Sequence, residues 1–288
     1  MRVNKVIQLL EEGQPVYYAS TDNLTYENGR DMAGTWADYI RLDLEHGVFD
    51  IKGVDEFMRG LVDGGPTPSG HRTPAVVAEL PMDGIDGQTV ASNSWMIKQL
   101  LARGVHGLIL CQVESASAAR AMVEFTRYSF QSLGVGPFLS QGRRGHGGQK
   151  KAAKIWGVSD TDYLKKADVW PLNPEGELIL GVKMENIRSV DNAEDIAKTP
   201  GLAYGEWGLG DMAMSCGYIE KPPFPLPERL EKIRTTIWNA CKKADLHFLG
   251  IVTPDTIKGL IDRGMTFCRA YEKETAEIGW KYTNRKMP

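Results

Sequence analysis

The sequence of 288 residues predicts a closed α/β barrel with eight strands, the (β/α)8 or TIM-barrel fold. Three observations support this prediction. Eight short apolar runs recur along the chain, helical patterns separate them, and two of the runs lead directly to a carboxylate. Short apolar runs are typical of strands that are buried on both faces of a parallel sheet. A doubly wound open sheet is the alternative, but the first strand-to-helix junction lacks the glycine fingerprint of a nucleotide-binding fold.

The predicted elements alternate along the chain and are bounded by glycine, proline or polar turn residues. The strands cover residues 14–20, 38–46, 74–81, 107–114, 178–185, 202–207, 247–252 and 265–269. The helices cover residues 1–12, 49–62, 93–102, 115–130, 152–167, 227–244, 254–263 and 273–282, and a further helical stretch ends near residue 36. Ser115 is an N-cap by residue type, and Gly104 follows the end of the preceding helix. We therefore predict that residues 1–288 form a single barrel domain with an N-terminal helix and a C-terminal helical extension.

The second predicted strand has an alternating pattern. Three apolar residues alternate with Arg41, Asp43 and Glu45, so that one face is apolar and the other is charged. In a barrel strand the charged face should point inward, towards the mouth. An exposed edge strand would show the same pattern, and the alternation alone does not separate these two interpretations.

Two later strands deliver acids to their carboxyl ends. Glu185 ends the strand that begins at Leu178, and Asp211 follows the next strand after Gly208 and Gly210. The carboxyl ends of barrel strands ring one mouth, where a hard divalent cation would offset the repulsion between two carboxylates. Glu185 and Asp211 are therefore candidate metal ligands, although a carboxylate after a strand is also a common helix N-cap.

Composition and charge exclude several classes of protein. The net charge of −3 gives no basic footprint for nucleic acid. No window approaches about 18 uncharged apolar residues, and the amphipathic N-terminus has no signal-peptide character, so we predict a cytoplasmic protein that does not bind membranes. The four cysteines are far apart and are expected to be reduced thiols. The glycine-rich run 142–148 suits either backbone contact with an anion or a surface loop.

Six segments carry a resemblance to one family, in the same order along the chain. They are Asp43-Leu-Glu-His46, the helix 95–104, the loop Gly142-Arg-Arg-Gly-His-Gly147, the helix 162–167, Val182-Lys-Met-Glu185 and Gly208-Leu-Gly-Asp211. Together they resemble the HpcH/HpaI aldolases, metal-dependent enzymes that act on 4-hydroxy-2-oxoheptanedioate and related 2-oxo acids. The resemblance runs from roughly residue 14 to residue 270 and implies a barrel of the phosphoenolpyruvate/pyruvate-domain type.

The resemblance also implies an activity and a site. The activity is a class II aldol reaction, with a 2-oxo acid such as pyruvate and an aldehyde as the small-molecule partners. Glu185 and Asp211 would hold Mg²⁺, Mn²⁺ or Co²⁺, which stabilises an enolate. His46 would act as the base beside Asp43, and Arg144 would assist near the mouth. Family members commonly form homo-oligomers, and we expect the same of this chain.

One departure from the family pattern affects the chemistry. The family has an arginine at the end of strand three that stabilises the enolate oxygen, whereas this chain has Ala78 or Glu79 there. Arg41 or Lys183, which replaces a glutamine of the family pattern, would supply the missing charge, and with Gly210 and Glu79 they are candidate substrate-binding residues. Two alternatives stay open: Arg41 and Glu79 form a buried ion pair without a catalytic role, or Lys183 forms a Schiff base.

The sequence therefore predicts an enzyme, a divalent-metal-dependent carbon–carbon lyase that acts on a 2-oxo acid. A decarboxylase of an oxaloacetate-like acid is a close alternative, because it would pass through the same enolate. A barrel that keeps the metal site but has lost catalysis is the alternative from another class, and the replacement of the strand-three arginine favours it.

Overall fold

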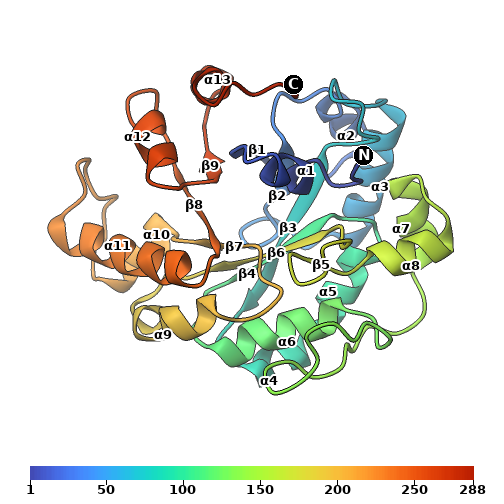
Figure 1. Cartoon of the computed structure of the whole chain (residues 1–288), viewed down its shortest axis with the longest axis horizontal. Coiled ribbons are helices and arrows are strands. Elements are labelled where there is room, and N and C mark those ends of the chain that lie inside the picture. The colour runs from blue at the N-terminus through green and yellow to red at the C-terminus, as the bar shows by residue number, and fades with distance from the viewer.

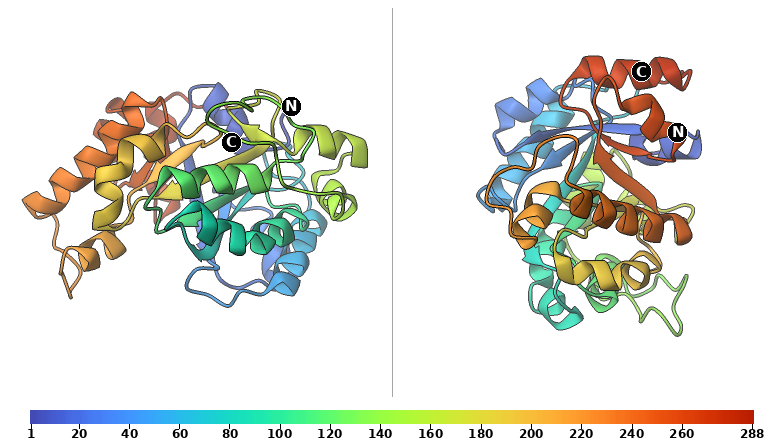
Figure 2. Two further views of the ribbon diagram at one scale, coloured as in Figure 1. Left: turned by 90° about the horizontal axis from the view of Figure 1, so that it is seen from below. Right: turned by 90° about the vertical axis from the view of Figure 1, so that its left-hand side faces the viewer.

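Eight parallel strands close into one barrel in the computed structural model, which describes all residues 1–288 (Figures 1 and 2). They are β1 (Val16–Thr21), β2 (Tyr39–Leu42), β3 (Ala75–Asp83), β4 (Gly107–Cys111), β6 (Leu178–Lys183), β7 (Tyr204–Glu206), β8 (His247–Ile251) and β9 (Phe267–Arg269). The pairings β1–β9 and β4–β6 complete the ring. The predicted (β/α)8 fold is confirmed. The two-residue strand β5 (Val169–Trp170), which pairs with the start of β6, was not predicted.

Thirteen helices surround the barrel or close its ends. They are α1 (Lys5–Glu11), α2 (Tyr26–Met32), α3 (Ile51–Asp63), α4 (Gly87–Ser92), α5 (Ser94–Leu101), α6 (Ala116–Thr126), α7 (Gln149–Trp156), α8 (Asp160–Lys166), α9 (Ile187–Ala197), α10 (Leu209–Ser215), α11 (Glu228–Lys243), α12 (Ile257–Asp262) and α13 (Lys273–Tyr282). The predicted helix 152–167 is divided into α7 and α8, because Gly157 adopts a left-handed conformation that ends α7.

The apolar core has two parts, one inside the barrel and one between the barrel and its helices. Tyr39 of β2 belongs to the inner part, whereas Ile40 and Leu42 belong to the outer part. Arg41 therefore points inward. It contacts Glu206 on β7, a strand that is not adjacent to β2. The charged face of this strand lines the barrel interior, and pairing of β2 on both sides excludes the edge-strand alternative.

The two terminal helices cover different parts of the barrel. Val6 and Ile7 of α1 join the inner core, beside residues at the starts of the strands, so α1 closes the amino-terminal end of the barrel. Trp280 of α13 packs edge-on against Tyr17 of β1 at a centroid distance of 6.2 Å. The C-terminal helix thus packs on the barrel of its own chain, and assembly into a homo-oligomer stays a prediction. No helix has the length and apolar character needed to cross a membrane.

Candidate functional site

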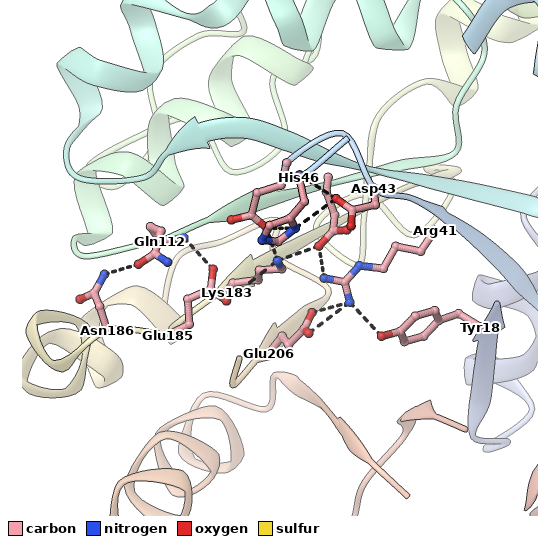
Figure 3. A network of polar contacts seen from close by, with 11 residues as sticks. Tyr18, Arg41, Asp43, His46, Gln112, Lys183, Glu185, Asn186 and Glu206 are labelled. Carbon is pink, nitrogen blue, oxygen red and sulfur yellow. Dashed lines mark hydrogen bonds and ion pairs between the residues drawn. The ribbon is translucent and has the colours of Figure 1, made fainter. Parts of the chain in front are cut away.

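Four charged side chains form a buried layer inside the barrel near the carboxyl ends of the strands, and Figure 3 labels Arg41, Lys183 and Glu206 among them. They are Arg41 on β2, Glu79 on β3, Lys183 on β6 and Glu206 on β7, and each is at most 5% exposed. Active sites of TIM barrels are built at this end. Charges buried to this extent are costly unless they are paired, so the pairing pattern shows what each residue is free to do.

Arg41 is committed to two carboxylates. Its guanidinium lies 2.9 Å from Glu206 Oε2, forms a short ion pair with Glu79, and donates to the Tyr18 hydroxyl at 3.1 Å. Burial would lower the pKa of Arg41, but the charge of Glu206 and the other neighbouring acids raises it well above the ordinary value. The predicted Arg41–Glu79 ion pair is therefore present, and it leaves Arg41 few donors for a substrate.

Lys183 lies among three acids. Its ammonium is 2.5 Å from Glu45 Oε2, 2.7 Å from Glu79 Oε1 and 3.9 Å from Glu185 Oε2. Although burial disfavours the charged form, the surrounding acids raise the pKa of Lys183. The amine therefore stays protonated, and a protonated amine is not a nucleophile. This environment disfavours the Schiff-base alternative.

Glu185 is the acid whose charge is least compensated. It is 1% exposed, and one oxygen accepts a hydrogen bond of 3.0 Å from the backbone N–H of Gln112. Burial, together with repulsion from Glu206 and Glu45, raises the pKa of Glu185 to about 8. A carboxylate with a pKa raised in this way would be stabilised in its charged form by an added cation.

The backbone around Glu185 holds its carboxylate in place. Gln112, directly after β4, has a φ of 49°, an uncommon conformation that directs its N–H to Glu185. The Asn186 amide donates to the Gln112 side chain at 2.9 Å. On the other side, a Cβ at Gly208 would lie only 2.0 Å from Glu185 Oε2, so a glycine is required there. Gly208 precedes α10, whose first turn contains Asp211.

The donors around Glu185 fit a hard divalent ion. Glu45, Glu79, Glu185 and Glu206 share the two cations Arg41 and Lys183, so two of the four acids have no cation of their own, and a divalent ion would offset their charges in the ionised form.

The side chains of Glu45, Cys111 and Glu185 also come within 4.8 Å of one another. However, burial raises the pKa of the Cys111 thiol well above its ordinary value, and a thiol that stays protonated is a poor ligand. Asp211 is not part of this group of three. It is partly exposed and forms no ion pair, which leaves its oxygens available for a metal.

His46 lies in the loop after β2, at the open side of the charged layer (Figure 3). Its side chain is 65% exposed, and its Nδ1 lies 3.3 Å from Asp43 Oδ1. The backbone N–H of His46 also donates to the same oxygen at 2.9 Å. Burial opposes the charge of Asp43, but these contacts with His46 lower its pKa. The carboxylate of Asp43 therefore holds the backbone and the imidazole of His46 in place.

Arg144 does not join this group, which corrects our expectation that it lies near the mouth. It belongs to the glycine-rich loop, and its side chain is buried. The guanidinium donates to the Tyr163 hydroxyl at 2.9 Å and lies 4.4 Å from the Tyr128 ring centroid. The Tyr163 hydroxyl in turn donates to Leu101 at the end of α5, the helix that leads into the start of β4. Arg144 therefore lies towards the amino-terminal side of the barrel. Spacing within a loop does not predict the direction in which the loop folds.

Sequence reasoning did not assign a role to Glu206 or Glu45. Glu206 has the same strand parity as the inward-facing Tyr204, and that signal could have placed it inside the barrel. A cavity of about 400 Å³ opens beside Glu206, and the backbone of Gly210 forms part of its wall.

Comparisons with known proteins found similar sequences. The model of the HpcH/HpaI aldolase/citrate lyase family matches residues 89–269. A hydroxypyruvate/pyruvate aldolase of Cupriavidus necator is 29% identical over 233 residues, which cover 80% of this chain and 72% of that protein. A protein of the same name from Chromohalobacter salexigens is 32% identical over 167 residues, which cover 58% of this chain and 57% of that protein.

Solved structures support the fold. A family protein from Burkholderia cenocepacia J2315 superposes with a TM-score of 0.72 at 21% identity, covering 98% of this chain and 97% of the other. An aldolase from Desulfitobacterium hafniense DCB-2 has a TM-score of 0.67 at 18% identity, covering 98% of this chain and 96% of the other.

Proposed function

Because this chain belongs to the HpcH/HpaI aldolase/citrate lyase family, we propose that it is a divalent-metal-dependent lyase that makes or breaks the carbon–carbon bond next to a 2-oxo acid. The assignment to the lyases follows from the family and from its relatives, which are named aldolases. The metal dependence rests on one observation. Glu185 is a buried carboxylate whose nearest cation, Lys183, lies 3.9 Å away and is held closer by Glu45 and Glu79, and it lies beside the turn that carries Asp211.

In the proposed site, Glu185 and Asp211 hold Mg²⁺, Mn²⁺ or Co²⁺. The bound metal would supply Lewis-acid stabilisation to the negative charge that develops on a pyruvate-like fragment. His46 takes and returns the proton at its imidazole, and Asp43 holds Nδ1 so that Nε2 is free for this transfer.

Lys183 is the better candidate for the charge that the strand-three arginine supplies in the family. Its ammonium is 3.9 Å from Glu185, whereas the donors of Arg41 are directed to Glu79, Glu206 and Tyr18. A fixed positive charge near the developing enolate lowers the barrier because it does not have to be reoriented during the reaction.

Proton exchange at the methyl group of pyruvate in deuterated water tests this function directly, because exchange requires the enolate but no aldehyde. NMR would follow exchange with Mg²⁺, Mn²⁺ or Co²⁺ added, and with a chelator as the control. We expect metal-dependent exchange that the Glu185→Gln variant loses, while its far-UV circular dichroism is unchanged. The matched control is Glu175→Gln, since Glu175 is exposed and forms no ion pair.

Three other outcomes separate the alternatives. A wild-type protein that binds metal but does not exchange pyruvate protons would support the non-catalytic barrel. Rapid release of CO₂ from oxaloacetate with slow aldol turnover would support the decarboxylase. Full exchange by Glu185→Gln would show that the metal assignment is wrong.

A further inference from the structure

Another cavity, of about 420 Å³, lies on the outside of the barrel, between the second half of α5 and the glycine-rich loop that leads into α7 (Figure 1). None of Glu185, Asp211 and His46 forms part of its wall, so it is separate from the proposed metal site. Ala102 is the one apolar residue on the wall. A molecule in this cavity would therefore meet polar and charged groups.

Three permanent cations and no acid line this cavity. The cations are Lys98, Arg103 and Arg144. Lys98 is exposed and forms no ion pair. Arg103 lies 3.7 Å from Asp55, which also pairs with Lys151 at 3.2 Å and is not part of the wall. The positive charge of the wall is therefore not offset by an acid on the wall itself.

Arg144 is a buried cation without a carboxylate partner. Its side chain is 3% exposed and packs against the rings of Tyr128 and Tyr163. One guanidinium nitrogen donates to the Tyr163 hydroxyl, whereas the other terminal nitrogen, Nη1, has no hydrogen-bond partner. A charge buried to this extent is costly unless an opposite charge lies near it, so an anion bound in the adjoining cavity would stabilise Arg144.

The backbone adds further donors at the start of α7. Gly148 is the N-cap of this eight-residue helix and supplies no side-chain cap. The backbone N–H groups of Gln149, Lys150 and Lys151 donate to no other group of the protein. Gly147 and Gly148 form part of the cavity wall, so the N-terminus of α7 opens beside the cavity. Free N–H groups and the helix dipole favour an anion at this position.

The ring of His146 contributes a donor as well. The Gln149 side-chain oxygen accepts from the backbone N–H of Gly147 at 2.8 Å, so the Gln149 amide nitrogen donates to His146 Nε2, 2.7 Å away. The proton of a neutral His146 ring is then on Nδ1. Cationic side chains, free backbone N–H groups and an imidazole N–H thus gather around one cavity, which is the composition of a phosphate site.

We propose that this cavity binds a phosphate group, carried by inorganic phosphate or by a small phosphate monoester. Phosphate fits better than a carboxylate, because its three terminal oxygens and its charge of about −1.5 to −2 match several donors that approach from different sides. Inorganic phosphate is much smaller than the cavity, which leaves room for the organic part of a monoester. The site does not depend on the proposed lyase function.

Gly145 offers a test that keeps the surrounding side chains. It lies on the wall, and a Cβ added to it would meet no atom within 4 Å. Gly145→Asp adds a negative charge to the cavity, and Gly145→Asn is the matched control with the same shape and no charge. Calorimetry would measure binding of inorganic phosphate and of glycerol 3-phosphate, with a chelator present and at low ionic strength, because salt screens exposed charges.

We expect saturable binding to the wild type and to Gly145→Asn, and at least about tenfold weaker binding to Gly145→Asp, because like charges would be brought together. Lys98→Gln, at an exposed position, should weaken binding about two- to fivefold, whereas Lys165→Gln on the exposed face of α8 should not. Tighter binding of glycerol 3-phosphate identifies a monoester as the ligand, and tighter binding of inorganic phosphate identifies the free ion. The absence of saturable binding of either probe to the wild type, or equal affinities of Gly145→Asp and Gly145→Asn, would overturn the proposal.

Discussion

Replacement of Lys183 with methionine should destabilise the barrel, because the ammonium compensates the buried Glu79 and the largely buried Glu45. The Lys183 side chain is 6% exposed, and its Nζ lies 2.5 Å from Glu45 and 2.7 Å from Glu79. Removal of one partner from a buried ion pair typically costs about 3 to 5 kcal/mol. Methionine has a similar length and keeps most of the apolar packing, so the loss of unfolding free energy measures the contribution of the charge.

The expected loss of unfolding free energy can be converted into a change in melting temperature. An unfolding entropy of about 2.1 cal/mol/K per residue gives roughly 0.6 kcal/mol/K for a chain of this length, so the melting temperature should fall by roughly 5 to 8 °C. The pKa of Lys183 is raised in the folded state. Its contribution is therefore fully present below the unfolded pKa of about 10.5 and is lost only as the pH rises through the higher folded value.

Urea unfolding at pH 7.5 and pH 5.5, followed by circular dichroism, measures the effect. The penalty of Lys183→Met should be smaller at pH 5.5, because the loss of Lys183 removes one of the charges that lower the pKa of Glu79, which can then bind a proton in the variant. Lys165→Met on the exposed face of α8 is the control and should change stability by less than about 0.5 kcal/mol. A variant at position 183 that unfolds like the control at pH 7.5 would refute the argument.

Three further predictions concern other sites. Burial lowers the pKa of His106 to about 3, below the ordinary 6.5. The free energy of unfolding should therefore fall by about 1.4 kcal/mol per pH unit below about 6.5. Between pH 7.5 and 5.0 the urea midpoint of His106→Gln should fall less than that of the wild type. In Gly208→Ala the new Cβ would meet Glu185 Oε2 at 2.0 Å, so calorimetry should find divalent-metal binding at least about tenfold weaker, and unchanged affinity would contradict the proposed ligand. Arg285→Met removes a cation from the buried Asp38, whose Oδ2 accepts from Arg285 at 2.9 Å, and should lower the free energy of unfolding by roughly 3 kcal/mol in urea titrations.

The sequence by itself determined the eight strands, their order along the chain and which side chains of β2 share a face. Each of the eight lies at the position that its apolar run predicted, within a few residues. These features are local: a run of apolar residues determines where a strand is buried, and the alternation of period two determines which side chains share a face. Glu185 and Asp211 could be proposed for the same reason, because both follow strands whose carboxyl ends meet at one mouth.

Apart from the Arg41–Glu79 pair, which the sequence had offered as one alternative, the tertiary structure decided which charges meet. Arg41 contacts Glu206 across 165 positions of the sequence, and Lys183 contacts Glu45 across 138. Arg144 has a motif that suggested the mouth, yet its loop folds towards the end of α5. Parity along a strand gives the direction of a side chain, whereas its partner across the barrel depends on closure through the β1–β9 and β4–β6 pairings. Closure of the ring depends on the register of all eight strand pairs together. A local sequence pattern therefore does not show which side chains meet across the barrel.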